Sequence, residues 1–185
     1  MDREYSFKNL TELNERESDE VLLGRNDAEV RRWMKSDRII APDEHRHFIA
    51  SLKVSSTQIY LRVERNGKFA GVYSLTELRG GSAIGGFWIT DYARQRLLGP
   101  SVVFQSIQYV FDTFAIKLIR GYQLIQNEPV AKLNAMLGFE ISEVPVDNDP
   151  RMRYLVLSRE KWFSRDLWDG KLLKLIEMAE RRNEH

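Results

Sequence analysis

The sequence contains no cysteine among its 185 residues, and that absence removes several classes of protein. Thiolate nucleophiles, cysteine-ligated zinc sites and disulfide frameworks all require a residue that this chain does not have. A chain of this length can bury enough apolar surface to fold without such cross-links. We therefore expect an ordinary packed core, and any group transfer must proceed without a covalent cysteine intermediate.

Long apolar runs and an excess of one charge are also missing. No stretch approaches the roughly 18 apolar residues of a membrane span, and the first residues, MDREYSFKNLTELNERES, contain no apolar core of a secretory signal. The 28 basic and 27 acidic side chains nearly cancel, which argues against a polybasic nucleic-acid-binding arm. We therefore expect a cytoplasmic protein that engages neither a membrane nor a nucleic acid.

No linker, repeat or low-complexity tract divides the chain, which predicts a single domain over 1–185 with a C-terminal helical extension over about 160–185. Asn66-Gly67 predicts a hairpin turn within an antiparallel meander over 58–89. Apolar periodicity and cap residues predict helices over 15–23, 27–34, 42–53, about 100–114, 128–137 and 166–182. Alternation and β-branched runs predict strands over 58–64, 68–75, 83–89, 117–126, 139–144 and 153–158.

The loop from Arg94 to Ser101 joins a predicted strand to the clearest predicted helix. A helix start exposes unpaired backbone N–H groups beside the positive end of the helix dipole, which favours an anion such as a phosphate. The stretch from Tyr92 to Gln123 carries one acid, Asp112, against four basic residues: Arg94, Arg96, Lys117 and Arg120. A solvated strand-to-helix loop has the same composition. The GxxxxGK[ST] and GxGxxG spacings are absent, which argues against those two nucleotide-binding classes.

Two motifs follow one another in this half of the chain. Arg96-Leu-Leu-Gly-Pro-Ser101 reads [QR]-x-x-G-x-[GA] with serine in the last small position, and the segment from Asn127 to Phe139 is similar to N-x-x-A-x-x-x-Y-x-x-x-G-F, with Asn134 at the position of the tyrosine. In this order, within a ββββαβαβ pattern, they resemble the GNAT superfamily of acetyl-CoA-dependent N-acyltransferases over nearly the whole chain. The resemblance implies an α/β (α+β) fold. Its sheet would be mixed, mostly antiparallel and twisted, with splayed fourth and fifth strands between flanking helices.

The same resemblance implies that acetyl-CoA binds in the opening between those two strands. Gly85-Gly86 would provide a bulge in the fourth strand, because paired strand glycines mark a bulge or a close backbone approach. Asn127 would contact the cofactor, although it also suits the cap of the following helix. The other implied cofactor contacts are the backbone at Trp88, Ile89 and Thr90 and the loop residues Arg94, Arg96, Leu97, Leu98, Gly99, Pro100 and Ser101.

Asn134 departs from the family pattern, because many members have at this position the tyrosine that protonates the departing coenzyme A thiolate. An amide cannot act as an acid. A thiol with a pKa of about 8.5 is nevertheless a tolerable leaving group, and water can supply the proton. Two readings stay open: direct attack of a neutral amine on the thioester without this acid, or a module that binds acyl-CoA and has lost turnover.

The first third of the sequence indicates the acceptor. The segments Arg25–Met34 and Glu44–Ile49 resemble the R-N-x-x-x-V-x-x-W-M and H-x-x-F-I patterns of a GNAT subgroup, the PseH type. That subgroup acetylates the 4-amino group of a UDP-linked amino-dideoxy sugar in the pseudaminic acid pathway of flagellin glycosylation. The RimJ/RimL branch, which acetylates protein amino termini, shares the first fragment. A small-molecule amine, a UDP-amino sugar above all, is the expected acceptor, and a protein N-terminus is the alternative.

Five side chains are candidates for binding this acceptor. Arg25 could pair with a diphosphate and Trp88 could stack on a ring, although a salt bridge and a core position are the respective structural alternatives. His45 shares a helix face with apolar residues and is either a core histidine or a substrate contact. Gly71 to Thr76 resembles the subgroup's third-strand segment G-V-x-S-I-T, which places Ser74 and Thr76 toward the acceptor.

Three residues are candidates for catalysis under this reading: Ser74, Asn134 and Glu77. Ser74 could relay a proton through water, and Glu77, with His45 and Asp91 as alternatives, could accept it. Asn134 occupies the position of the missing acid. No metal is implied, and a homodimer stays open.

Overall fold

The computed structural model describes residues 5–142, 149–164 and 170–182. Its centre is a seven-stranded sheet with the order β1-β2-β3-β4-β5-β7-β6, in which β4 and β5 run parallel and the other neighbours run antiparallel. This arrangement confirms the predicted α/β class with a mixed, mostly antiparallel sheet. The strands are β1 Tyr5–Asn9, β2 Ile59–Arg65, β3 Lys68–Arg79, β4 Ser82–Ile89, β5 Leu118–Leu124, β6 Glu140–Ile141 and β7 Met152–Ser158.

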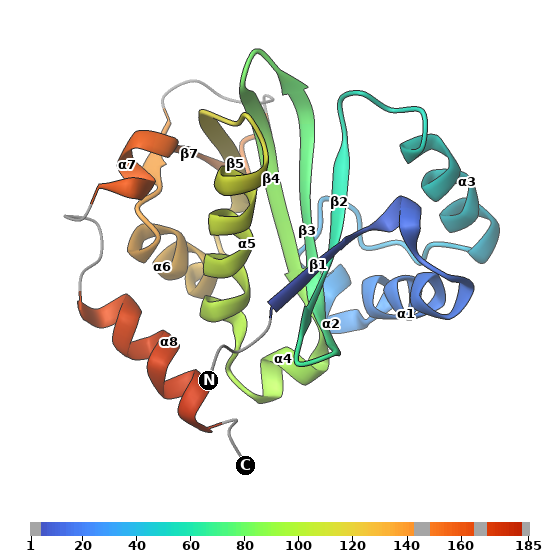
Figure 1. Ribbon diagram of the computed structural model, residues 1–185, viewed down its shortest axis with the longest axis horizontal. Coiled ribbons are helices and arrows are strands. Elements are labelled where there is room, and N and C mark those ends of the chain that lie inside the picture. Colours follow the sequence, from blue (N-terminus) through green and yellow to red (C-terminus); the bar gives the residue numbers. More distant parts are fainter. Residues whose placement is uncertain (1–4, 143–148, 165–169, 183–185) are drawn as a thin grey trace.

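Helices cover both faces of the sheet. Figure 1 shows α1 and α3 on one side of the sheet and α5 and α8 on the other. The helices are α1 Glu15–Asn26, α2 Ala28–Arg31, α3 Pro42–Leu52, α4 Asp91–Gln95, α5 Gly99–Thr113, α6 Glu128–Met136, α7 Arg159–Phe163 and α8 Gly170–Arg182, with a short 3-10 helix at Leu10–Glu12. Among the described residues, no helix is long and apolar enough to cross a membrane.

Alternation along the strands gives each face of the sheet its own core. Leu61, Val63 and Tyr73 point toward α5 and belong to the larger core, which also contains Leu172 and Ala179 of α8. The residues between them point the other way, where Val72 and half-buried Trp88 pack with Val21 of α1 and Leu52 of α3. The central strands are therefore buried on both faces.

The hairpin and helix signals of the sequence are confirmed. Asn66 and Gly67 both have positive φ, 50° and 71°, as a two-residue hairpin turn requires. Pro100 lies in the first turn of α5, and Gly138, with φ 83°, follows the end of α6. Turn and cap residues were therefore a sufficient guide to where these elements begin and end.

Several predicted boundaries were wrong. β3 continues to Arg79, past its predicted end at residue 75, and turns at Gly80-Gly81. β1 and α4 were not predicted, because β1 is short and largely polar and α4 has only five residues. The predictions over 143–144 and 166–169 lie outside the described residues.

A buried ion pair attaches α8 to the sheet. Arg65 at the end of β2 is 2% exposed, and its Nε donates to the carboxylate of Glu180 on α8 at 2.9 Å. The Tyr5 hydroxyl of β1 donates to the same carboxylate at 2.9 Å, and its oxygen lies 2.8 Å from Ser101 Oγ, which also donates to Glu180. We call these four residues the Glu180 cluster; it joins β1, β2, α5 and α8.

Candidate active site

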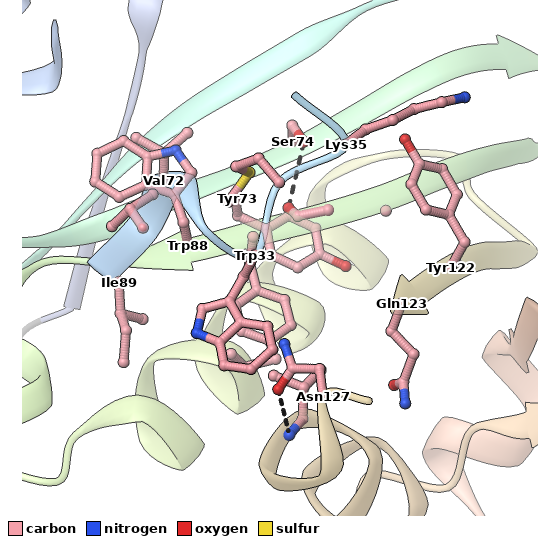
Figure 2. Close-up of a pocket in the computed structure, with 18 of the residues that line it drawn as sticks. Trp33, Lys35, Val72, Tyr73, Ser74, Trp88, Ile89, Tyr122, Gln123 and Asn127 are labelled. Carbon is pink, nitrogen blue, oxygen red and sulfur yellow. Dashed lines mark hydrogen bonds between the residues drawn. The ribbon is translucent and has the colours of Figure 1, made fainter. Parts of the chain in front are cut away.

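A cavity of about 990 Å³ extends from α1–α3 through the middle of the sheet to α6. This volume lies at the upper end of the range for small-molecule sites. Figure 2 shows part of its lining, with Ser74 and Trp88 on the central strands and Gln123 and Asn127 on the β5–α6 side. The predicted site residues that line the cavity are Arg25, His45, Ser74, Thr76, Trp88, Ile89, Arg94, Gly99, Pro100, Asn127 and Asn134.

The cavity passes through an opening between β4 and β5. Only the first residues of these strands pair: Ser82–Ile84 of β4 with Leu118–Arg120 of β5. Beyond that point β4 continues to Ile89 and β5 to Leu124 without pairing to each other. The predicted splay is therefore confirmed. Past the last pair, the facing strand edges can bind an extended ligand that has hydrogen-bonding groups of its own.

Gly85 and Gly86 lie just past that last pair, but they form no bulge against β3. They pair in unbroken register with Leu75 and Ser74, so the predicted bulge position was wrong. A Cβ on Gly85 would lie 2.8 Å from both Ile119 Cγ2 and the Tyr73 hydroxyl oxygen. The glycines are required for close packing at the narrow end of the opening.

The register shift lies instead in β3, between Thr76 and Arg79. Glu77 occupies this irregularity with φ 51°, a left-handed conformation that is uncommon for a non-glycine residue. Its carboxylate lies 3.5 Å from Arg120, and Glu77 is not among the cavity-lining residues. The structure thus contradicts the predicted role of Glu77, because the bulge interrupts the alternation that carries Ser74 and Thr76 into the cavity. Asp91, the alternative base, does not line the cavity either and lies 3.5 Å from Arg94.

The start of α5 has the geometry of an anion site. The first intrahelical hydrogen bond runs from Val102 N–H to the Leu98 carbonyl at 2.9 Å, so the N–H groups of Gly99 and Ser101 precede it. No side chain caps this helix end, and Leu97 in the entry loop has φ 58°. Gly99 and Pro100 line the cavity, so the helix start opens into it.

Two residues predicted to contact the cofactor, Thr90 and Arg94, belong to α4 and its N-cap. Thr90 is its N-cap, and the Thr90 N–H donates to the Ala70 carbonyl at 2.9 Å, so this N–H is not available for a ligand. Arg94 donates to the Ile89 carbonyl at 3.0 Å and to Asp27 at 2.9 Å. Its charge is therefore compensated within the fold. The Thr90 N–H cannot contribute to the predicted backbone contact at this residue, because β3 already accepts its hydrogen bond.

The remaining loop residues differ widely in exposure. Leu98 is fully buried in the main core, whereas Leu97 is 56% exposed. The guanidinium of Arg96 lies 4.7 Å from the centre of the Tyr92 ring. Ser101 is 1% exposed, and its hydroxyl belongs to the Glu180 cluster, so the side chain of Ser101 is not free to bind a ligand. None of these four residues is among those that line the cavity.

Asn127 follows β5 and performs the capping function that its sequence position allowed. Its Oδ1 accepts a hydrogen bond from Val130 N–H at 3.4 Å at the start of α6. Asn127 is 8% exposed and lines the cavity, as Figure 2 shows. A contact with the cofactor stays a prediction.

Arg25 lies at the end of α1 with its guanidinium partly buried. Among the described residues, its Nη1 finds no hydrogen-bond partner, and burial together with the charges of Arg31 and Arg38 lowers the pKa of the Arg25 guanidinium. The salt bridge considered as a structural alternative is therefore not formed at this atom. An unpaired buried donor costs free energy unless a ligand satisfies it. Arg25 lines the cavity and can bind an anion there.

Positive charge predominates around this half of the cavity. The charged lining residues are five basic and two acidic side chains, with Glu29 and Glu44 as the acids and Arg25, Arg32, Lys35, Arg38 and Arg94 as the bases. Ion pairs compensate three of these bases, Arg32 with Glu29, Arg38 with Glu44 and Arg94 with Asp27. The excess of positive charge that is left favours an anionic ligand over a polycation.

His45 and Trp88 belong to the packing of this face as well as to the cavity. His45 Nε2 lies 3.1 Å from both Ser18 Oγ and the Ser18 carbonyl oxygen, so it joins α3 to α1. Burial lowers the pKa of His45 and favours its neutral form. Trp88 packs edge-on against Phe69 with 5.7 Å between ring centroids. Both structural alternatives are thus realised, and both side chains still line the cavity.

Ser74 lies opposite Gly86 in the sheet, on the face covered by α1–α3. Its Oγ donates to the Gly86 carbonyl at 3.3 Å. With its hydrogen used in this way, the oxygen presents its lone pairs as acceptors. Thr76 lies two residues along the same face, so both predicted acceptor contacts line the cavity rather than a solvated surface.

Asn134 forms a buried pair with a residue that the sequence analysis did not single out. Its Nδ2 donates to Gln123 Oε1 at 2.6 Å, and the two residues are 8% and 6% exposed. Gln123 Nε2 is buried without a partner. Within the described ranges, Gln123 Nε2 and Arg25 Nη1 are the two buried side-chain polar atoms that lack one, and both residues line the cavity.

Two aromatic lining residues were also missed. Trp33 follows α2 and lines the cavity, although its position in the W-M motif could have identified it. Tyr73 is 3% exposed on the core face of β3, and burial raises the pKa of its hydroxyl. In the part of the chain described, no group of three or more metal-ligating side chains occurs.

Comparisons with known proteins give consistent matches. A profile of the acetyltransferase (GNAT) domain family matches residues 9–140. The curated acetyltransferase PseH of Campylobacter jejuni subsp. jejuni serotype O:23/36 (strain 81-176) is 26% identical over 143 residues, which cover 76% of this chain and 88% of that protein.

Solved structures share the fold. The Campylobacter jejuni N-acetyltransferase PseH in complex with acetyl coenzyme A has a TM-score of 0.67 at 21% identity and covers 84% of this chain and 99% of its own. The Vibrio cholerae spermidine N-acetyltransferase in complex with CoA and spermine has a TM-score of 0.72 at 14% identity and covers 85% and 97% of the two chains. Both show the same sheet-and-helix arrangement as this chain.

Proposed function

The chain belongs to the acetyltransferase (GNAT) domain family, and from that premise we propose that it acetylates the 4-amino group of a UDP-linked amino-dideoxy sugar. It is an N-acetyltransferase that uses acetyl-CoA. The identity of the acceptor goes beyond what the family membership shows. The observation that supports a sugar nucleotide is Arg25 Nη1, a buried cationic donor in the cavity that has no partner among the described residues. A diphosphate would satisfy this atom, because phosphate oxygens accept charge-assisted hydrogen bonds.

The residues of the opening fit acetyl-CoA. The divergent edges of β4 and β5 can hydrogen-bond an extended arm, and the N–H group of Gly99, which lines the cavity at the start of α5, can bind its pyrophosphate. Bound acetyl-CoA supplies the acetyl group as a thioester. In this arrangement Trp88 and Ile89 provide the β4 backbone beside the arm, and Asn127 lies on its β5 side.

The acceptor half of the cavity supports an anionic sugar nucleotide over a polyamine. A spermidine-type acceptor is a polycation, whereas the charged lining has five basic against two acidic residues. Trp88 and Trp33 offer flat apolar surfaces for a uracil or sugar ring. Likeness to a spermidine acetyltransferase in fold therefore does not extend to its acceptor.

Ser74 is proposed to position the acceptor amine. Its hydroxyl donates to the Gly86 carbonyl at 3.3 Å, which leaves the oxygen to accept a hydrogen bond from an amine N–H or from a water O–H. The amine nitrogen forms the new bond to the acetyl carbon while the carbon–sulfur bond breaks, and the amine loses one proton through water. An amide has no proton to give to the departing sulfur, so Asn134 is no general acid and coenzyme A leaves as the thiolate.

An amine panel tests the proposal against its alternatives. Purified protein would be supplied with acetyl-CoA and a UDP-4-amino-4,6-dideoxy sugar, a set of peptides with free N-termini, or spermidine, and CoA release would be measured. We expect the sugar nucleotide to react far faster than the others. Efficient peptide acetylation would favour the protein N-terminal acetyltransferase reading. Tight acetyl-CoA binding without turnover of any amine would favour the non-catalytic module.

A further inference from the structure

The Gln123 side chain has one of its two polar ends paired and the other unpaired inside the cavity. Asn134 Nδ2 donates to Gln123 Oε1 at 2.6 Å, which fixes the amide. The amide nitrogen is then directed elsewhere and finds no partner, although Gln123 is only 6% exposed. An unsatisfied buried donor costs folding free energy. A ligand acceptor at this point would remove that cost.

Strand register places Gln123 well inside the opening between β4 and β5. The last parallel pair is Ile84 with Arg120, and Gln123 is three residues further along β5, level with Phe87 of β4. Gly85 marks the narrow end of the opening, and the start of α5 lies beyond the far end of β4. If the pyrophosphate binds at α5, the acyl end of the same molecule points toward the narrow end and lies beside Gln123.

We propose that Gln123 Nε2 donates a hydrogen bond to the thioester carbonyl oxygen of the bound acyl donor, with Asn134 as the residue that positions the Gln123 amide. The proposal rests on the proposed use of acetyl-CoA in this opening. It gives Asn134 a role that an amide can perform, since orientation needs a donor and no ionisable group. Negative charge develops on that carbonyl oxygen during acyl transfer, so a fixed amide donor favours the reaction.

Gln123 therefore recognises the acyl group rather than the arm. Acetyl-CoA and CoA share the pyrophosphate and the arm amides and differ in the thioester. A bond to the thioester oxygen predicts that loss of Gln123 Nε2 weakens acetyl-CoA binding and leaves CoA binding nearly unchanged. A merely structural role of the Gln123–Asn134 pair would change both affinities together, through the shape of the opening.

The test compares Gln123→Met/Asn134→Leu with Asn134→Leu and wild type by calorimetric titration of acetyl-CoA and of CoA. Replacing both partners of a buried hydrogen bond by apolar groups of similar shape is close to neutral for folding. We expect the double variant to bind acetyl-CoA about tenfold more weakly and CoA within about twofold of wild type. Asn134→Leu, which keeps the donor, should lose less acetyl-CoA affinity than the double variant.

A folded double variant that binds acetyl-CoA like wild type would overturn the proposal, and so would equal losses for acetyl-CoA and CoA. If the double variant does not fold, Gln123→Glu keeps the acceptor for Asn134 and removes the amide donor, with the same selective loss expected at alkaline pH. Failure of wild type to bind acetyl-CoA would instead contradict the proposed function. The two failures are therefore distinguishable.

Discussion

Two regions of this protein bury polar side chains and differ in whether the buried polar atoms have hydrogen-bond partners. In the Glu180 cluster, Arg65, Glu180, Tyr5 and Ser101 bond one another across four elements. In the cavity, Arg25 and Gln123 each leave a buried donor without a partner. Because an unsatisfied buried group costs folding free energy, it is retained where a ligand can satisfy it. The satisfied cluster therefore stabilises the fold, and we propose that the unsatisfied groups bind ligands.

Removing one partner from the Glu180 cluster should have the largest effect. Glu180→Ala leaves Arg65, which is 2% exposed, as an uncompensated buried charge. We expect the free energy of unfolding to fall by about 3–5 kcal/mol, measured by urea denaturation. Glu177→Ala, on an exposed position of the same helix, is the matched control and should change stability by less than about 0.5 kcal/mol. Equal effects from the two variants would show that the cluster contributes nothing specific.

Removing an unsatisfied group should have the opposite profile. Arg25→Met eliminates a buried donor without a partner, so stability should stay the same or rise. Binding of UDP, measured by calorimetry as a probe of the acceptor half, should weaken about tenfold to a hundredfold. Arg16→Met on the exposed side of α1 controls for loss of charge. A large loss of stability with unchanged UDP binding would place Arg25 on the structural side of the comparison.

Acid should weaken the satisfied cluster. Burial alone would raise the pKa of Glu180, but hydrogen bonds from Ser101, Arg65 and Tyr5 lower it below the ordinary value of 4.5. A carboxyl group with a lowered pKa in the folded state stabilises the protein above its unfolded pKa. That contribution is lost as the pH falls through the folded-state pKa. Glu180→Gln should therefore be less stable near neutral pH and should show a shallower loss of stability in acid, measured by urea denaturation across this range.

His45 sharpens the comparison, because it lines the cavity and yet has a partner in Ser18. Burial lowers its pKa below the ordinary value of 6.5, so protonation opposes folding. Stability is fully present above that value and is lost as the pH falls toward the folded-state pKa. His45→Gln should flatten this small slope in thermal denaturation. If His45→Gln instead weakens UDP binding as much as Arg25→Met does, a hydrogen-bond partner does not distinguish the structural residues from those that bind a ligand.

Local patterns were enough to predict most of the fold. Asn66-Gly67 located the hairpin, and the apolar stripe that begins after Pro100 located α5. Both signals depend on neighbours within one turn or one strand. Ser74 and Thr76 were also placed correctly in the cavity lining, because alternation along β3 holds up to the bulge at Glu77.

The rest of the site depends on contacts between distant parts of the chain. Arg65 is separated from Glu180 by 115 residues, so nothing in β2 indicates that its terminal arginine is buried. Gln123 lies in a largely apolar strand, and nothing in the strand indicates that its amide pairs with Asn134 on the next helix. The Thr90 N–H bonds to Ala70 and Arg94 bonds to Asp27, and both partners lie too far away in sequence for local patterns to indicate them.

The distance along the chain between Arg65 and Glu180 also sets the order in which this protein can be completed during synthesis. Strands β2 to β4 and the start of α5 leave the ribosome well before α8 does, since translation runs from the N-terminus. Until α8 has been made, Arg65 lacks its carboxylate and Ser101, in the first turn of α5, lacks the group that holds it. Strands β2 to β4 can therefore pair early, whereas the first turn of α5 becomes fixed only as the last helix docks.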